Sequence, residues 1–136
     1  TIKAQITINS DITTNPITIT KEMIMHKFQS GVGLEETTGL RTKKFAAETA
    51  VVVVEQDEFT STKASKVYMR NTGTSSEDFF YVAKHASAAA SDTDGETIGK
   101  LHGGDWLLIP YLADVNITVA PSTTGAMTLE YIVFAE

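Results

Sequence analysis

The sequence predicts an all-β fold, a jelly-roll-like antiparallel β-sandwich of eight or nine strands. Three observations favour this class. Apolar and polar residues alternate with a period of two, the pattern of a strand with one buried face. Turn-forming clusters of glycine, proline, serine and threonine separate these segments at intervals of about 8–12 residues. Threonine, isoleucine and valine dominate the composition, and such β-branched side chains suit a pleated, half-buried surface.

The N-terminal segments alternate clearly. Residues 2–8 place isoleucine and alanine on one face, and lysine, glutamine and threonine on the other. Pro16 cannot donate to a β-ladder, so the short segment Ile17–Ile19 is expected at a sheet edge or at the start of a strand. Residues 21–29 fit either a helical turn or a strand, and a strand is favoured. Residues 1–20 form either the first strands of the sandwich or an extended arm, and both interpretations stay open.

The central segments predict a buried strand and a hairpin. Val51–Val54 is a continuous β-branched run, typical of a strand buried on both faces. Lys66–Asn71 alternates, and Asp78–Lys84 is expected to return as its hairpin partner. Residues 85–95 are the best candidate for a mobile loop. Further strands are expected at Thr97–Leu101, Trp106–Ile109, Asn116–Ala120 and Met127–Phe134.

The composition limits the functional classes. A chain of 136 residues, 42% hydrophobic, predicts one domain over residues 1–136 with a core that needs no staple. The absence of cysteine excludes thiolate catalysis and disulfides. A net charge of −6 argues against a nucleic-acid partner. Neither a signal-peptide pattern nor an apolar run long enough to cross a bilayer is present, so we expect a soluble chain without a membrane partner.

The polar residues form no recognisable catalytic or metal-binding pattern. The three histidines lie in separate segments, and the acidic pairs lie in expected turns. Leu101–Pro110 (LHGGDWLLIP) is similar to the strand turn of cupins, but the His-x-His and the later histidine that bind the cupin metal are missing. We therefore expect no catalytic residue, no metal and no cofactor. A cupin-like metalloenzyme that uses His102 is the rival class.

Two groups of side chains are candidates for binding. Basic residues gather in the middle of an otherwise acidic chain: Arg41, Lys43, Lys44, Lys63, Lys66 and Arg70. Such a group is usually a solvated face, but in an acidic chain it also fits one half of a complementary protein interface. Trp106 and three tyrosines could bind sugar, although their strand pattern favours the core, where Trp106 is expected.

Several sequence segments resemble those of the small β-sandwich structural proteins of tailed-bacteriophage virions. Lys63–Thr74 (KASKVYMRNTGT) resembles their lysine-containing strand and its Asn-Thr-Gly turn. Leu101–Pro110, followed by Asn116–Ala120, resembles the turn and strand before their last hairpin. Leu129–Glu136 (LEYIVFAE) resembles their closing strand. The resemblance covers about the second half of the chain, and residues 1–45 do not contribute to it.

The resemblance implies a non-enzymatic part of a virion, assembled in the cytoplasm of a bacterial host. The implied role is a head decoration (cement) protein that contacts the major capsid protein or other virion proteins. The alternative is a tail, neck or fibre module that contacts other tail proteins or host glycans. Self-association is expected because a small β-domain must cover or pair its sheet edges. The resemblance favours a trimer, since decoration proteins of the resembled family often lie at symmetry axes. An alternating N-terminal segment also suits strand addition to a neighbour.

Overall fold

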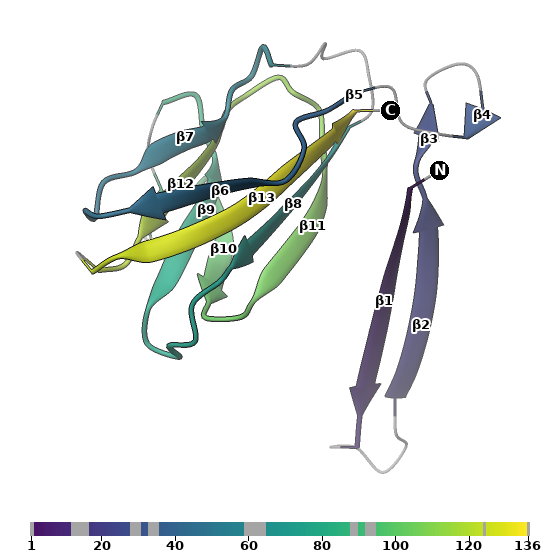
Figure 1. Ribbon diagram of the computed structural model, residues 1–136, viewed down its shortest axis with the longest axis horizontal. Helices are drawn as coiled ribbons and strands as arrows, with labels where there is room; N and C mark the ends of the chain where they lie inside the picture. Colours follow the sequence, from purple (N-terminus) through teal and green to yellow (C-terminus); the bar gives the residue numbers. More distant parts are fainter. Residues whose placement is uncertain are drawn as a thin grey trace.

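Two antiparallel sheets pack face to face in the computed structural model (Figure 1). It describes residues 2–11, 17–27, 31–32, 36–58, 65–87, 90–91, 95–123 and 125–135. The five-stranded sheet consists of β5 (Glu36–Thr37), β6 (Arg41–Phe45), β8 (Ser65–Asn71), β11 (Trp106–Tyr111) and β13 (Met127–Ala135). The four-stranded sheet consists of β7 (Val51–Val54), β9 (Phe79–Lys84), β10 (Thr97–His102) and β12 (Ile117–Pro121).

The strand pairing is that of a jelly roll. From the middle of the sandwich sequence outward, β9 pairs with β10, β8 with β11, β7 with β12, and β6 with β13. These nested pairs are one long hairpin folded into two sheets, ordered β6-β13-β8-β11 and β7-β12-β9-β10. A double-sheet arrangement of this kind defines the jelly roll. The predicted all-β, jelly-roll-like sandwich is confirmed, and the described residues include no helix that could span a membrane.

The core lies between the two sheets and follows the alternation of the sequence. In β13, every second residue from Met127 to Ala135 is buried, and the residues between are half-buried. Phe45 of the larger sheet and Phe80 of the smaller sheet bring their ring centroids within 5.2 Å across the core. Val54 and Phe80 are fully buried, and each such side chain contributes about 1.5–3 kcal/mol by leaving water. The predicted burial of Val51–Val54 is confirmed for Val53 and Val54. Val51 and Val52 are only half-buried in this edge strand.

The predicted hairpin between residues 66–71 and 78–84 is wrong. The first segment is β8 in the five-stranded sheet, whereas the second is β9 in the four-stranded sheet. Val67 and Phe80 therefore face the same core from opposite layers. The connection crosses between the sheets, and the buried Asn71 anchors its start by accepting a hydrogen bond from Gly73 N and donating one to Leu101 O. The true hairpin partner of β9 is β10.

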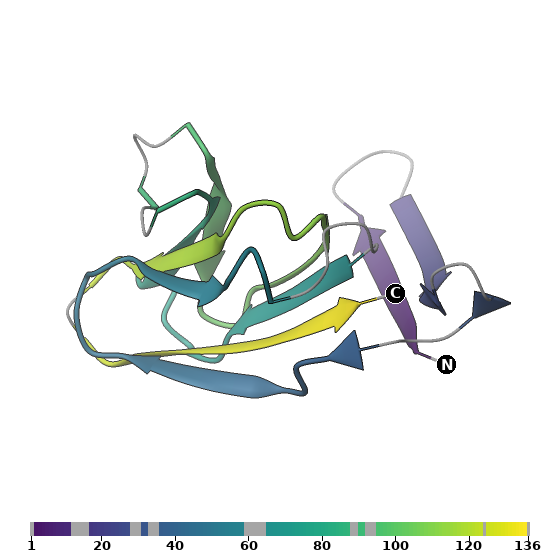
Figure 2. The same ribbon diagram turned by 90° about the horizontal axis from the view of Figure 1, so that it is seen from above.

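A separate two-stranded arm stands beside the sandwich. It consists of β1 (Lys3–Ser10) and β2 (Ile17–Ile24), paired in antiparallel register from Lys3 opposite Ile24 to Ser10 opposite Ile17. Both views show it next to the jelly roll and outside its two sheets (Figures 1 and 2). β2 begins directly after Pro16, as expected, and takes up the first part of the ambiguous segment as a strand. The short strands β3 (His26–Lys27) and β4 (Gly31–Val32) pair with each other.

Candidate protein interface

The arm has one apolar face. Residues directly opposite each other in an antiparallel pair lie on the same side, so Ile8 and Ile19 share a face with Ile6 and Ile17. These four isoleucine residues are 46%, 40%, 39% and 46% exposed, respectively. Lys21 is the charged residue of this face. An exposed apolar face on a projecting element is typical of a surface that is covered by a partner.

The other face of the arm is polar and adds little stability. Thr7 lies opposite Thr20 there, and Lys3 Nζ forms an ion pair with Glu22 Oε1 at 3.0 Å. Both charged side chains are about half exposed, and such a pair contributes only about 0–1 kcal/mol. Because a lone two-stranded hairpin is marginally stable in water, further packing is needed to hold the arm.

The outer face of the five-stranded sheet is also apolar in part. The register places Leu108, Tyr68 and Ile132 in one row across β11, β8 and β13. The neighbouring row contains Trp106, Arg70 and Glu130. An antiparallel sandwich usually presents polar residues on its outer faces. Half-buried aromatic and aliphatic side chains here therefore mark this face as unusual.

The expectation that Trp106 lies in the core is wrong, because its side chain is 50% exposed. Leu107 and Ile109 pack against the core instead, which turns Trp106 and Leu108 outward on β11. The run WLLI is apolar on both faces of the strand, so its residue types could not indicate which set faces inward. Tyr111 does lie in the core. Burial raises its pKa to about 12, with a further increase from the charges of nearby carboxylates.

A groove of about 800 Å³ separates the arm from this outer face. The groove is lined on the arm side by Ala4, Ile6, Lys21 and Met23 of the apolar face together with Gln5 and Glu22 of the polar face, and on the sheet side by Tyr68, Arg70, Gly104, Trp106 and Leu108. The two apolar surfaces of the molecule thus face the same open space. Figure 1 shows the arm standing beside β11, with the end of β1 and the start of β2 extending past the sandwich.

Polar groups on the outer face are arranged around Glu130. The Tyr68 hydroxyl donates a hydrogen bond to Glu130 Oε1 at 3.4 Å, and the register places Arg70 directly opposite Glu130. Partial burial, followed by the negative charge of Glu130, raises the pKa of Tyr68. The outer face therefore carries a neutral phenol that is hydrogen-bonded to the side chain of Glu130.

The predicted basic residues divide between the two sides of the five-stranded sheet. Lys44, Lys66 and Arg70 belong to the outer face, as their partners in the register show. Arg41 and Lys43 lie on the other side of β6; Arg41 Nη1 forms an ion pair with Glu58 Oε1 at 2.9 Å. Lys63 lies outside the described residues. The outer-face residues are next to the apolar surface, and Arg70 lines the groove.

The outer face of the four-stranded sheet carries a second, smaller aromatic group. Phe79 and Tyr81 meet edge to face at 4.9 Å, and the His102 ring lies 5.1 Å from Phe79. Lys100 Nζ lies 4.5 Å from the centroid of the Phe79 ring and 5.3 Å from that of Tyr81. These cation–π contacts place the lysine over both rings and occupy the surface that a ligand would need for stacking.

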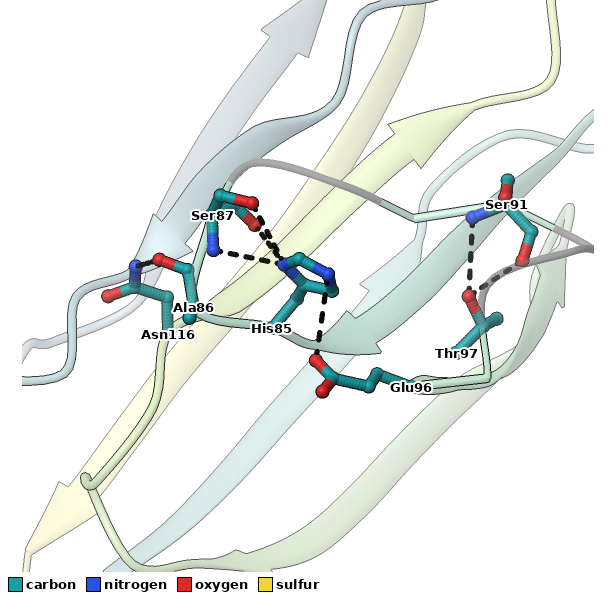
Figure 3. A network of polar contacts seen from close by, with 7 residues as sticks. All are labelled: His85, Ala86, Ser87, Ser91, Glu96, Thr97 and Asn116. Atoms are coloured by element: carbon teal, nitrogen blue, oxygen red, sulfur yellow. Dashed lines mark hydrogen bonds and ion pairs between the residues drawn. The ribbon is translucent and has the colours of Figure 1, made fainter.

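The expected mobile loop is tied down where the structure describes it (Figure 3). His85 Nδ1 lies 3.0 Å from the backbone nitrogen and 2.9 Å from the carbonyl oxygen of Ser87. Asn116 Nδ2 donates to Ala86 O at 3.1 Å. Thr97 Oγ1 donates to Ser91 O at 2.7 Å and accepts from Ser91 N. Residues 88–89 and 92–94 of the predicted loop lie outside the described residues.

This network contains serine, histidine and glutamate, which invites comparison with a catalytic triad. Ser87 Oγ lies 3.1 Å from His85 Nδ1, but His85 Nε2 lies 3.7 Å from Glu96 Oε2, too far for a hydrogen bond. The backbone of Ser87 contacts the same Nδ1 atom, which makes the serine contact part of a local turn. The geometry fits a loop anchor better than an activated nucleophile.

The described residues contain no group of three or more histidine, aspartate or glutamate side chains placed to hold a metal ion. His102, the residue of the metalloenzyme alternative, has its Nδ1 atom 2.9 Å from Ser76 O, within hydrogen-bond distance. The turn after it is tight, as Gly103-Gly104 predicts: Asp105 N donates to His102 O and Asp105 Oδ2 accepts from His102 N. The likeness of this segment to cupins is thus accounted for by the turn of a jelly roll.

Comparison of the chain with protein-family models, curated proteins and solved structures finds no match.

Sequence reasoning missed the outer apolar face, although a signal was present. In Leu129–Phe134 the residues between the buried positions are Glu130, Ile132 and Phe134, two of which are large and apolar. A strand in the middle of a sheet with apolar residues at both parities indicates that both faces are covered.

Proposed function

We propose that the protein is a non-enzymatic structural protein that acts through protein–protein contacts, and specifically that it decorates and cements the capsid of a bacteriophage. The observation that carries the proposal is the exposed apolar face of the arm, opposite a second apolar face on the sandwich. Surfaces of this kind serve association, because a soluble monomer rarely leaves them in water.

The charge distribution supports a protein partner. Lys44, Lys66 and Arg70 border the apolar outer face in a chain of net charge −6. A locally basic rim around an apolar centre suits an acidic partner surface, since interfaces commonly have an apolar core and a polar rim. The major capsid protein or another virion protein is the proposed partner.

The resemblance supports the virion as the location. The segments that carry it fall on β8, on the turn between β10 and β11, on β12 and on β13. Two of these strands, β8 and β13, form the middle of the five-stranded sheet, and the proposed contact surface is its outer face. The proposal places the protein on particles assembled in the bacterial cytoplasm.

A glycan-binding module of the tail or fibre is the alternative, and one observation favours it. Trp106 is half exposed beside Tyr68 and Arg70 in the groove, and an exposed tryptophan with polar neighbours can stack on a sugar ring. The cement role ranks first because the arm has no purpose in glycan stacking, whereas both surfaces serve protein association.

Depletion of the protein from particles separates these two roles. We expect particles without it to lose heat stability while host adsorption stays intact, and added purified protein to restore stability. The variant Ile8→Lys/Ile19→Lys changes the apolar face of the arm and should fail to restore it. The matched variant Thr7→Lys/Thr20→Lys places the same charges on the opposite face and should succeed. The opposite result would establish the glycan role: depleted particles keep their heat stability but lose host adsorption, and adsorption is restored by the wild-type protein but not by Trp106→Ala.

A further inference from the structure

The sandwich of the same chain can cover only part of the arm. The arm residues that line the groove are near the end of the arm where Lys3 lies opposite Ile24, whereas Ile8, Ile17 and Ile19 lie closer to the other end, where Ser10 is opposite Ile17, and do not line it. Figure 1 shows this end of the arm extending past the sandwich. Closure of the groove within one chain would therefore leave most of the isoleucine face in water.

The outer face of the five-stranded sheet has the length to cover the whole arm. Each strand of the arm has eight residues and spans about 27 Å, while the nine residues of β13 span about 30 Å. Tyr68, Leu108 and Ile132 form an apolar row across this face. Glu130 on the same face offers a carboxylate to Lys21, the charged residue among the apolar side chains of the arm.

The area favours a reciprocal contact. A two-stranded ribbon about 27 Å long and roughly 10 Å wide buries about 540 Å² in total when one face is covered. One such contact falls within the range of crystal packing, below about 800 Å². Two reciprocal contacts bury about 1,100 Å², which exceeds the roughly 1,000 Å² expected of a specific interface.

We propose that copies of this chain exchange arms: the apolar face of one arm lies along the outer face of the five-stranded sheet of a second copy. Each copy gives and receives one arm, so two copies close as a two-fold symmetric dimer. The two-stranded arm is narrower than the five-stranded sheet, so the β6 side of the outer face, with Lys44, stays open for the partner proposed above. The contact stands on the geometry of the chain and does not depend on where the protein acts.

Light scattering on the purified protein gives the first test. We expect a mass of twice 14.7 kDa for the wild type and for Thr7→Lys/Thr20→Lys. Ile8→Lys/Ile19→Lys should weaken association by more than tenfold while the thermal midpoint of the sandwich stays close to that of the wild type. A monomeric wild type, or equal effects of the two double variants, would overturn the proposal.

Cross-linking identifies the receiving face. Because the chain has no native cysteine, only the introduced cysteines can react. Chains with Ile8→Cys are mixed with chains that carry Leu108→Cys and treated with a short bismaleimide. We expect mixed dimers as the main product. A chain carrying both substitutions that cross-links mainly within itself would show closure in one chain, and products mainly between two Ile8→Cys chains would show packing of arm on arm. Either result refutes arm exchange onto the sheet.

Discussion

Asn71 fixes the connection between the two sheets at its start, and its amide should be required for stability. The side chain is 2% exposed; its Nδ2 atom donates to Leu101 O at 3.0 Å and its Oδ1 atom accepts from Gly73 N at 2.9 Å. Asn71→Ala removes both bonds and leaves two backbone groups without these partners. Each buried unsatisfied group costs about 1–3 kcal/mol, so we expect a loss of roughly 2–4 kcal/mol. For a chain of 136 residues this lowers the thermal midpoint by about 10 °C.

Asn71→Asp tests the direction of the two hydrogen bonds. The carboxylate can still accept from Gly73 N, but its second oxygen would face the carbonyl oxygen of Leu101. Burial and this contact raise the pKa of the new carboxyl in the folded state. The protonated form donates to Leu101 O, so stability is fully present below the unfolded pKa of about 3.9 and is lost as pH rises through the folded value.

Urea unfolding between acidic and neutral pH measures this effect. We expect the difference in free energy of unfolding between wild type and Asn71→Asp to grow with pH. Asn9→Asp makes the same chemical change at an exposed position of the arm and should show no such trend. A pH-independent difference for Asn71→Asp, or a loss below about 1 kcal/mol for Asn71→Ala, would refute the assigned bonds.

Three further predictions concern single positions. Gly103→Ala should destabilise the fold, because the added Cβ atom would lie 2.6 Å from backbone atoms, whereas Gly99→Ala meets nothing within 4 Å; their thermal midpoints should differ by several degrees, and equal midpoints would contradict the packing. Leu129→Ala should cost about 2–5 kcal/mol in urea unfolding, since the side chain is fully buried, and a cost below 1 kcal/mol would mean that the core refills the cavity. Because the pKa of Tyr111 is raised to about 12 in the folded state, its contribution to stability is fully present below about pH 10 and is lost as pH rises to about 12. Tyr111→Phe should therefore reduce the loss of stability at alkaline pH. An unchanged loss of stability in this variant would mean that another group causes it.

The sequence predicted strand positions and fold class well, because local alternation determines both. Lys66–Asn71 and Met127–Phe134 are strands, as expected, and alternate residues in each are buried. Which strands pair with each other was harder to predict from the sequence. The erroneous hairpin between β8 and β9 followed from their adjacency in sequence, but a short polar connection can turn within one sheet or cross between two, and only the packing of both strands against one core decides.

The candidate interface was predictable only in part. The alternation of residues 2–8 fitted both a first strand of the sandwich and an extended arm, and it did not indicate that its partner strand is β2. Trp106 was misplaced because apolar residues occupy both faces of β11. The basic residues were selected by their charge alone, without regard to strand alternation, and Arg41 and Lys44 lie on opposite sides of β6.

The nested pairing of the jelly roll also sets an order of folding. β9 and β10 are neighbours in sequence, whereas β6 must find β13, with residue 45 opposite residue 127. Direct closure of the outermost pair is entropically costly, but each inner pair shortens the loop that the next pair must close. The strands should therefore pair in order, beginning with β9 and β10 and ending with β6 and β13. Substitutions in β9 and β10 should then slow folding, whereas substitutions in β6 should mainly speed unfolding. The arm, a local hairpin, can close within microseconds, but it stays marginally stable until the sheet that receives it has formed.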